Sequence, residues 1–465
     1  YRRGRDACRA ALRLDGTRAV ALAQRGHLEL QYADYLRWRL GADPVPRYGI
    51  ALRQQIEATR MATGSAIVHA MLSESYLRFG LYEGDAVTHA SQPRDARPYV
   101  DLAAAHIRVA MQREPTNRLF VRYLAMVLSQ RAWTESLAGR DPTRSAHAAH
   151  RLQLASRRAR DNVSVRTNRA RGIFDIWRAV LHHDLDRGKL LQPGLRLMRQ
   201  ALEEAGTPLA DTGWDLWTWS LVHQYEAVEA WGTARDPRTA FDQATRYLQR
   251  AQHLDPQQMT FLRNEVSVLE ARIDTQWIFG GTIDLAWLAR QRARLGALHA
   301  RAIDAPARAA VDQTLWRLAA QRQAMDGGDT WADVPARTIV FASVREPVRR
   351  AELALWPGLA AAARDGDRAA ARRWRVVIDE AARAAASASA PDAEQDRIRA
   401  MAHRLDAALA EDVRTRTHHV AEVERLADAI VRRNPWQRHE AQLLRLALAS
   451  RALAPTVRQI VPPRG

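Results

Sequence analysis

The sequence predicts an all-α protein, and more specifically a right-handed α-solenoid of stacked antiparallel helix pairs. The composition is rich in alanine, leucine, arginine and glutamate, which favour helices, and β-branched residues never form a series of alternating strands. One helix ending recurs along the chain, and the turns within the helix pairs recur with a similar spacing. A repeated unit allows a chain of 465 residues to form one elongated core, because such a core grows lengthwise.

The recurring ending is clearest at residues 239–256. Ala244, Leu248 and Ala251 lie at offsets of 0, 4 and 7, and Pro256 follows at offset 12. The small residues let a neighbouring helix approach closely, the leucine fills the space between them, and the proline ends the helix. This stretch therefore predicts the second helix of a packed pair.

Two markers give the period of the repeat. The first is an alanine followed five residues later by a chain-breaking residue, found at steps of 45, 46 and 50 residues at Ala110, Ala155, Ala201 and Ala251. A related ending at Ala11 lies about two steps earlier. The second marker is the turn inside each pair, at residues 43–44, 95–98, 141–142 and 236–237. Unrelated helices have no reason to keep both spacings, so the markers predict a unit of about 48 residues.

Each unit is expected to contain a first helix of about 20 residues, a turn, and a second helix of about 16 residues that ends near proline or glycine. The first helices are predicted at residues 17–40, 64–82, 116–138, 162–185, 211–233 and 257–279. The second helices are predicted at residues 47–63, 97–113, 143–160, 190–205, 238–253 and 283–303.

The period weakens after residue 303. One more helix is expected at residues 307–324, followed by an extended connection at 337–344. Further helices are expected at 348–385 and 393–450, joined by a linker. We therefore divide the chain into a repeat array at 1–303, a connecting segment at 304–347 and a helical cap at 348–465, because an end repeat must cover the apolar face of its neighbour.

Over about residues 1–303 the chain resembles the tetratricopeptide repeat (TPR) family. The resemblance rests on two copies of the ending, namely Ala244, Leu248, Ala251 and Pro256, and Ala103, Ile107, Ala110 and Pro115. The family's usual unit is about 34 residues, so the units here are longer, with an extended first helix and turn. The resemblance implies a TPR-like superhelix that binds a protein or peptide partner.

The long pairs, with Arg-Asp-Pro turns and Ala-x-x-Leu-Asp-Pro endings, resemble the helical region that follows the kinase domain in some bacterial serine/threonine protein kinases. Asn434, Pro435 and Trp436 are similar to the end of such regions, and a comparable region follows winged-helix domains in some transcription regulators. The chain begins with Tyr1 and has no signal-peptide pattern, so we expect a missing N-terminal part. These resemblances imply a regulatory or sensory region of a larger bacterial signalling protein, in the cytoplasm or attached to the inner membrane through a missing segment.

No catalytic signature is present. Kinase catalysis needs a glycine-rich phosphate loop, a lysine on a strand and catalytic aspartates in recognisable surroundings. Lys189, the only lysine, lacks the spaced glycine of a phosphate loop. We therefore expect no enzyme, no catalytic residue and no cofactor. A hidden enzyme would need ionisable residues that converge in a pocket, which only a structure can reveal.

Three pairs of histidines are the candidates for metal binding, namely His147 with His150, His182 with His183 and His418 with His419. Adjacent histidines on a helix point about 100° apart, and no carboxylate completes a set at ligand spacing. Cys8 is the only cysteine, which excludes an intramolecular disulfide and a thiolate cluster. We therefore expect no metal site.

The candidate peptide contacts lie on the first helices. In the TPR family, first-helix residues that lie off the packing stripe line the concave groove where peptides bind. The resemblance assigns this role to Arg122, Met126, Asp215, Trp219 and Glu226. Aromatic residues and arginine are also common interface anchors. The alternative for Trp219 is packing between helices.

The formal net charge of +18 raises nucleic-acid binding as the alternative function. The densest basic run contains Arg157, Arg158, Arg160, Arg166, Arg169 and Arg171. Nearby Phe174 and Trp177 could stack on bases, or they could belong to the core. The strong preference for arginine over lysine indicates genomic bias. No stretch of about 18 uninterrupted apolar residues exists, so we expect no membrane span.

Overall fold

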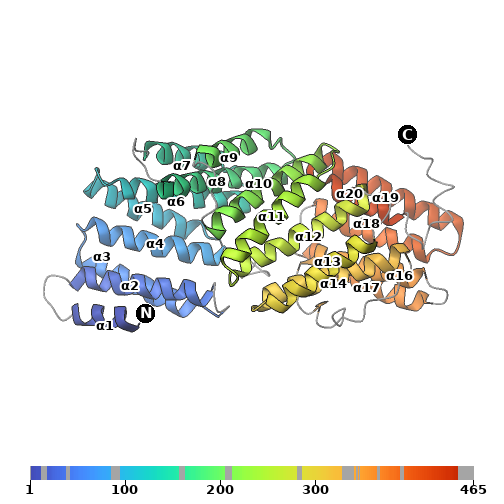
Figure 1. The fold of residues 1–465 in the computed structure, drawn as a ribbon, viewed down its shortest axis with the longest axis horizontal. Helices are drawn as coiled ribbons and strands as arrows, with labels where there is room; N and C mark the ends of the chain where they lie inside the picture. Colours follow the sequence, from blue (N-terminus) through green and yellow to red (C-terminus); the bar gives the residue numbers. More distant parts are fainter. Residues whose placement is uncertain are drawn as a thin grey trace. The chain divides into compact units, whose positions relative to one another are not determined.

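The computed structural model describes residues 2–11, 18–37, 42–84, 95–156, 163–204, 212–279, 285–326, 340–341, 344, 346–363, 367–387 and 392–448. These residues form nineteen α-helices and a short 3₁₀ helix, and they contain no strand (Figure 1). The all-α prediction is thus confirmed. Every helix predicted up to residue 303 coincides with an observed helix, with ends that agree within five residues. Among the described helices, none combines the length and apolarity needed to cross a membrane.

The helices fall into two compact units. Unit 1 consists of Tyr1–Thr218 and Leu254–Gln258, and unit 2 consists of Trp219–His253 and Met259–Gly465. The first change of unit along the chain lies inside one helix, α10 (Gly213–Gly232).

Unit 1 is a row of helices in two layers. Its helices are α1 (Arg2–Ala11), α2 (Arg18–Tyr35), α3 (Val45–Met61), α4 (Ala66–Glu83), α5 (Arg97–Arg113), α6 (Arg118–Leu137), α7 (Thr143–Ala155), α8 (Val163–Asp186) and α9 (Gln192–Glu204), followed by the start of α10. Each of the helices α1 to α8 contacts the next, and α2, α4, α6 and α8 also contact one another in order (Figure 1). This is the contact pattern of a helical-repeat array.

The predicted turn markers share one local structure. The side chains of Asp43, Asp95, Asp141 and Asp236 each accept a hydrogen bond from the backbone N–H two residues later, at 2.9–3.0 Å. Such a turn satisfies a backbone donor at the point where the second helix of the pair begins. The marker that defines the period in the sequence is therefore a helix-initiating turn.

The recurring endings are packing positions where the side chains are described. Ala103, Ile107 and Ala110 of α5 are fully buried, and so are Ala244, Leu248 and Ala251 of α11 (Arg238–Leu254). The weaker copy differs, because Ala155 is exposed at the end of α7. The side chain of Ala201 lies outside the described residues.

Unit 2 contains the rest of α10, followed by α11, α12 (Met259–Phe279), α13 (Leu285–Arg301), α14 (Ala305–Asp326), α16 (Pro347–Ala362), α17 (Arg368–Ser387), α18 (Asp392–Leu409), α19 (Val413–Arg433), η2 (Pro435–Gln437) and α20 (Arg438–Leu448). Within it, α12, α14, α16, α18 and α20 each contact the next, and α20 contacts α12 as well. These five helices therefore close a ring. The helix expected at residues 307–324 is α14, one of these ring helices.

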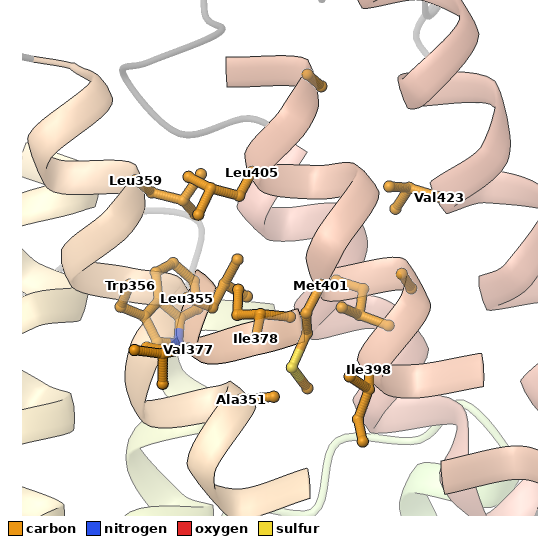
Figure 2. Packing of buried hydrophobic residues seen from close by; sticks show 14 of the residues in the cluster. Ala351, Leu355, Trp356, Leu359, Val377, Ile378, Ile398, Met401, Leu405 and Val423 are labelled. Carbon is orange, nitrogen blue, oxygen red and sulfur yellow. The ribbon is translucent and has the colours of Figure 1, made fainter. Parts of the chain in front are cut away.

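A large hydrophobic core of unit 2 lies around α16, α17 and α18. Leu355, Ile378 and Met401 come from these three helices and converge, while Leu359 lies beside Leu405 (Figure 2). Helices α13, α17 and α19 pack against the ring helices that precede and follow them in the chain. The core and the ring together fix the position of the charged side chains described below.

Candidate functional site

The predicted contact Trp219 belongs to a cluster of stacked rings on α10 and α11. Its indole ring is half-buried and stacks on Tyr247, with 6.1 Å between the ring centroids and 18° between the planes. His223 stacks on the same tyrosine at 5.5 Å. The Nδ1 atom of His223 lies 2.9 Å from Oε2 of Glu226, the second predicted contact on this helix. We call Trp219, His223, Glu226 and Tyr247 the Trp219 cluster.

The cluster follows from helix geometry. Trp219, His223 and Glu226 are spaced four and three residues apart, which places them on one face of α10. Two reciprocal amide hydrogen bonds between Gln224 and Asn264, of 2.9 and 3.2 Å, attach α10 to α12. The rings are therefore presented from a helix whose position is fixed.

Asp215 has a different environment. Its side chain is 6% exposed, and the Thr212 hydroxyl donates a hydrogen bond of 2.6 Å to its carboxylate. The backbone N–H of Asp215 in turn donates to the Thr212 hydroxyl at 3.2 Å. The pair closes the first turn of α10, which leaves Asp215 little surface for a partner.

Arg122 and Met126 lie on α6 in unit 1, whereas the Trp219 cluster lies in unit 2. Arg122 is half-buried and Met126 is 36% exposed. Leu119, which the sequence reasoning did not select, is 63% exposed and shares their helix face, because the spacings are three and four residues. The structure thus joins Trp219 with Glu226 on α10 and places Arg122 with Met126 on α6 of unit 1.

The expected nucleic-acid contacts are only partly accessible. Arg157, Arg158, Arg160 and the side chain of Arg166 lie outside the described residues. Arg169 is buried, and the Arg171 guanidinium lies 5.5 Å from the centre of the Trp214 ring. Phe174 and Trp177 are buried in the core, and the Trp177 indole donates a hydrogen bond to His150. These two aromatic residues are therefore unavailable for stacking on bases.

The three histidine pairs have different roles. His147 and His150 pack edge-on against Trp177, and His182 contacts the Ser136 hydroxyl and the Trp133 ring. His419 instead approaches His403 and Asp406 of the preceding helix, and the potential ligand atoms of these three residues all lie within 4.8 Å of one another. This group contains one histidine of the third pair, and its carboxylate comes from the neighbouring helix rather than from a residue at local sequence spacing.

A network of buried and half-buried ionic side chains, which the sequence analysis missed, runs through the ring of unit 2. Arg317 of α14 donates to both oxygens of Asp274 at 2.8 and 2.7 Å and also pairs with Glu270, both on α12. Arg349 of α16 donates to Glu270 at 2.5 and 3.0 Å. The acceptors on α12 thus bind arginines from two other ring helices.

The network continues through α16, α18 and α20. Arg397 of α18 lies 2.5 Å from Glu352 of α16 and 2.8 Å from Glu440 of α20. Glu440 also lies 2.9 Å from Nε2 of His439. Each of the five ring helices therefore contributes at least one charged side chain. Buried carboxylates and guanidiniums require such pairing, because an unpaired buried charge is strongly unfavourable.

The network shifts two carboxyl pKa values in opposite directions. Burial would raise the pKa of Glu270, but the positive charges of Arg349 and Arg317 outweigh it and lower the value to about 2. Burial raises the pKa of Asp274 to about 6, despite the opposing charge of Arg317. Burial likewise opposes ionisation of Glu440, and the charge of Arg397 holds its pKa well below the usual range. Titratable groups do converge here, and each of these three carboxylates is paired with an arginine.

No protein-family model matches the chain, and no curated protein matches it. The resemblance to TPR proteins and to the kinase-associated helical regions therefore rests on the residues quoted above.

Proposed function

We propose that this chain is a non-enzymatic scaffold that binds a protein or peptide partner through the Trp219 cluster. The half-buried stack of Trp219 on Tyr247 is the observation that carries the proposal. Rigid aromatic side chains bury a large area on binding at a small cost in conformational entropy, and they are frequent interface anchors. The scaffold would act by presenting these rings from a fixed helix pair.

The charge of the cluster indicates the chemistry of the partner. Glu226 places a carboxylate beside the rings, and the faces of Trp219 and Tyr247 attract cations. We therefore infer that the partner is a peptide segment with an arginine or lysine anchor. A basic anchor is also repelled by most of this positively charged chain, so binding would depend on this local site.

We propose further that the helix pairs are antiparallel and wind into a right-handed superhelix, as a regulatory region of a larger bacterial signalling protein. The short connections support the antiparallel arrangement. In the pair of α6 and α7, which pack together, Thr143 follows Leu137 by six positions, which span at most about 22 Å. A parallel arrangement would need a connection about as long as α6, which measures about 30 Å, so the short connection favours antiparallel packing.

The test uses basic peptides selected from a random library on the immobilised chain. Their affinity is then measured by fluorescence anisotropy for the wild type, Trp219→Ala and Trp287→Ala. Trp287 is a matched control, because it is also a half-buried tryptophan of unit 2. We expect Trp219→Ala to weaken binding at least tenfold and Trp287→Ala to leave it unchanged. Equal affinities for all three proteins would contradict the assignment of the site.

The same measurement with a labelled oligonucleotide tests the alternative, an arginine-rich nucleic-acid-binding protein or the effector region of a winged-helix regulator. Six to ten phosphate contacts would weaken binding by about 10³ to 10⁵ between 50 and 200 mM salt. The contact between a peptide and the Trp219 cluster is expected to change much less. Tight, steeply salt-dependent binding of the oligonucleotide alone would favour the alternative.

A further inference from the structure

We propose that His403, Asp406 and His419 form a binding site for a divalent transition metal of the zinc class, between α18 and α19 of unit 2. The proposal is independent of peptide binding at the Trp219 cluster. It rests on the geometry of the three ligands, on the side chain that orients the carboxylate, and on a second histidine pair in unit 1 that lacks a carboxylate.

The three side chains converge because two of them share one helix face. His403 and Asp406 are three residues apart on α18, and His419 comes from α19, which packs against α18. The Nδ1 atoms of His403 and His419 are 3.0 Å apart. Two nitrogen ligands of a tetrahedral zinc ion lie about 3.3 Å apart, since each Zn–N bond is about 2.0–2.1 Å. The two imidazoles therefore need only a small adjustment to bind one ion.

Asp406 is held in place by an arginine. Arg375 of α17 donates to both carboxylate oxygens of Asp406, at 2.7 and 3.0 Å. Each oxygen keeps a further lone pair that can bind a metal. Partners of this kind orient the ligands in metal sites.

The positive charge of Arg375 opposes a cation, but acidic neighbours offset it. Arg375 also pairs with Asp379, and Arg425 pairs with Glu422, which interacts electrostatically with His403. Each of these two arginines thus has a carboxylate partner other than Asp406.

The ligand types select the metal. Two imidazoles and one carboxylate suit zinc, copper or nickel, whereas magnesium and calcium prefer sites made of oxygen ligands. The three side chains are half-buried, so an ion from solution has access. Three protein ligands leave a fourth tetrahedral position for water or for the exposed His418, whose ring centroid lies 6.4 Å from that of His403.

A histidine pair in unit 1 provides an internal comparison. His69 and His106 also have their Nδ1 atoms 3.0 Å apart, but the other ring nitrogen of His69 lies 3.1 Å from the Thr63 carbonyl oxygen. His106 stacks on Tyr76. Among the described residues, no carboxylate joins this pair at ligand distance. A hydrogen bond explains His69 and His106, whereas the site at His403 has the additional ligand.

The experiment uses the full chain without an affinity tag, treated with a chelator and then dialysed. Zinc is titrated calorimetrically into the wild type, His403→Gln, His419→Gln and His106→Gln. We expect one zinc ion per chain, affinity at least tenfold weaker in the first two variants, and wild-type affinity in His106→Gln. Zinc uptake by His403→Gln and His419→Gln that equals the wild type would overturn the proposal.

A second measurement needs no variant and remains valid if the substituted proteins do not fold. Cobalt(II) is added to the wild type, and its visible absorption is recorded. Four-coordinate cobalt gives an intense spectrum that zinc should abolish by competition, whereas a weak, six-coordinate spectrum contradicts the site.

Arg375→Gln tests the positioning role of the arginine. We expect about 10- to 100-fold weaker binding and an altered cobalt spectrum. Unchanged or tighter binding would show that Arg375 does not orient the ligand.

Discussion

Trp436 packs so closely against Gly232 that a Cβ atom on the glycine would lie 2.1 Å from the indole ring. Trp231, the preceding residue of α10, stacks on His439 of α20 with 4.0 Å between the ring centroids. The Asn434-Pro435-Trp436 motif thus attaches the C-terminal part of unit 2 to the end of α10.

This close approach predicts that Gly232→Ala destabilises unit 2. The new methyl group would force the indole ring or the helix to move, and overpacking of this kind costs about 1–3 kcal/mol. Gly296→Ala on α13 is the matched control, because a Cβ there meets no atom within 4 Å. Alanine favours the helix, so the control should be more stable by about 0.5–1 kcal/mol. Urea unfolding followed by circular dichroism measures both changes, and a neutral Gly232→Ala would contradict the close packing.

Removing Arg317 should strongly destabilise the ring. Asp274 accepts side-chain hydrogen bonds from Arg317 and Gln321, and the substitution Arg317→Met removes the first of these partners. The same substitution removes one of the arginines that pair with Glu270. Breaking a buried ion pair costs about 3–5 kcal/mol, because a buried charge loses its compensation. Arg368→Met is the control, since its pair with Glu411 is exposed and is worth about 0–1 kcal/mol. Similar unfolding free energies for the two variants would show that the network has no special role.

The two shifted carboxyl groups predict opposite pH dependences of stability. The pKa of Glu270 is about 2 in the folded chain, compared with an ordinary value of 4.5. Its contribution to the free energy of unfolding is therefore present above pH 4.5 and is lost as the pH falls toward 2. The pKa of Asp274 is about 6 in the folded chain, compared with an ordinary value of 3.8. Its contribution to the free energy of unfolding is therefore present below pH 3.8 and is lost as the pH rises to 6. Each of these two pKa shifts corresponds to a change of about 3 kcal/mol in the free energy of unfolding.

The pH prediction is tested by comparing the free energy of unfolding of the wild type with that of Asp274→Asn and of Glu270→Gln between pH 3 and 7. Relative to Asp274→Asn, the wild type should lose stability between pH 4 and 6. Relative to Glu270→Gln, it should gain stability as the pH rises from 3 to 4.5. Parallel pH profiles for all three proteins would mean that neither carboxyl group has the shifted pKa.

The helices could be predicted from the sequence because their signals are local. Asp43, Asp141 and Asp236 each start a helix through a hydrogen bond to a residue two positions away, and Ala244 and Leu248 mark a face that packs against a neighbouring helix. Such signals lie within one or two turns of the chain. The helix positions of the repeat array follow from them.

The ring and the charged clusters could not be predicted in this way. Glu270 and Arg349 are 79 residues apart, and a chain with 70 basic and 52 acidic residues offers many equivalent pairings. The approach of Asp406 to His419 could not be predicted from local spacing, because Asp406 lies on the preceding helix. Partner choice over such separations depends on tertiary packing, which leaves no periodic pattern.

The contact between α20 and α12 sets a limit on how the two units can change in evolution. An open row such as unit 1 can gain or lose a helix pair at the cost of one altered interface, because each pair contacts only its neighbours. In the ring of five helices, an additional helix between α20 and α12 would open the contact that closes the ring, so unit 2 is expected to tolerate such an insertion less well. Length variation among descendants of this chain is therefore expected in unit 1, while the number of ring helices in unit 2 stays constant.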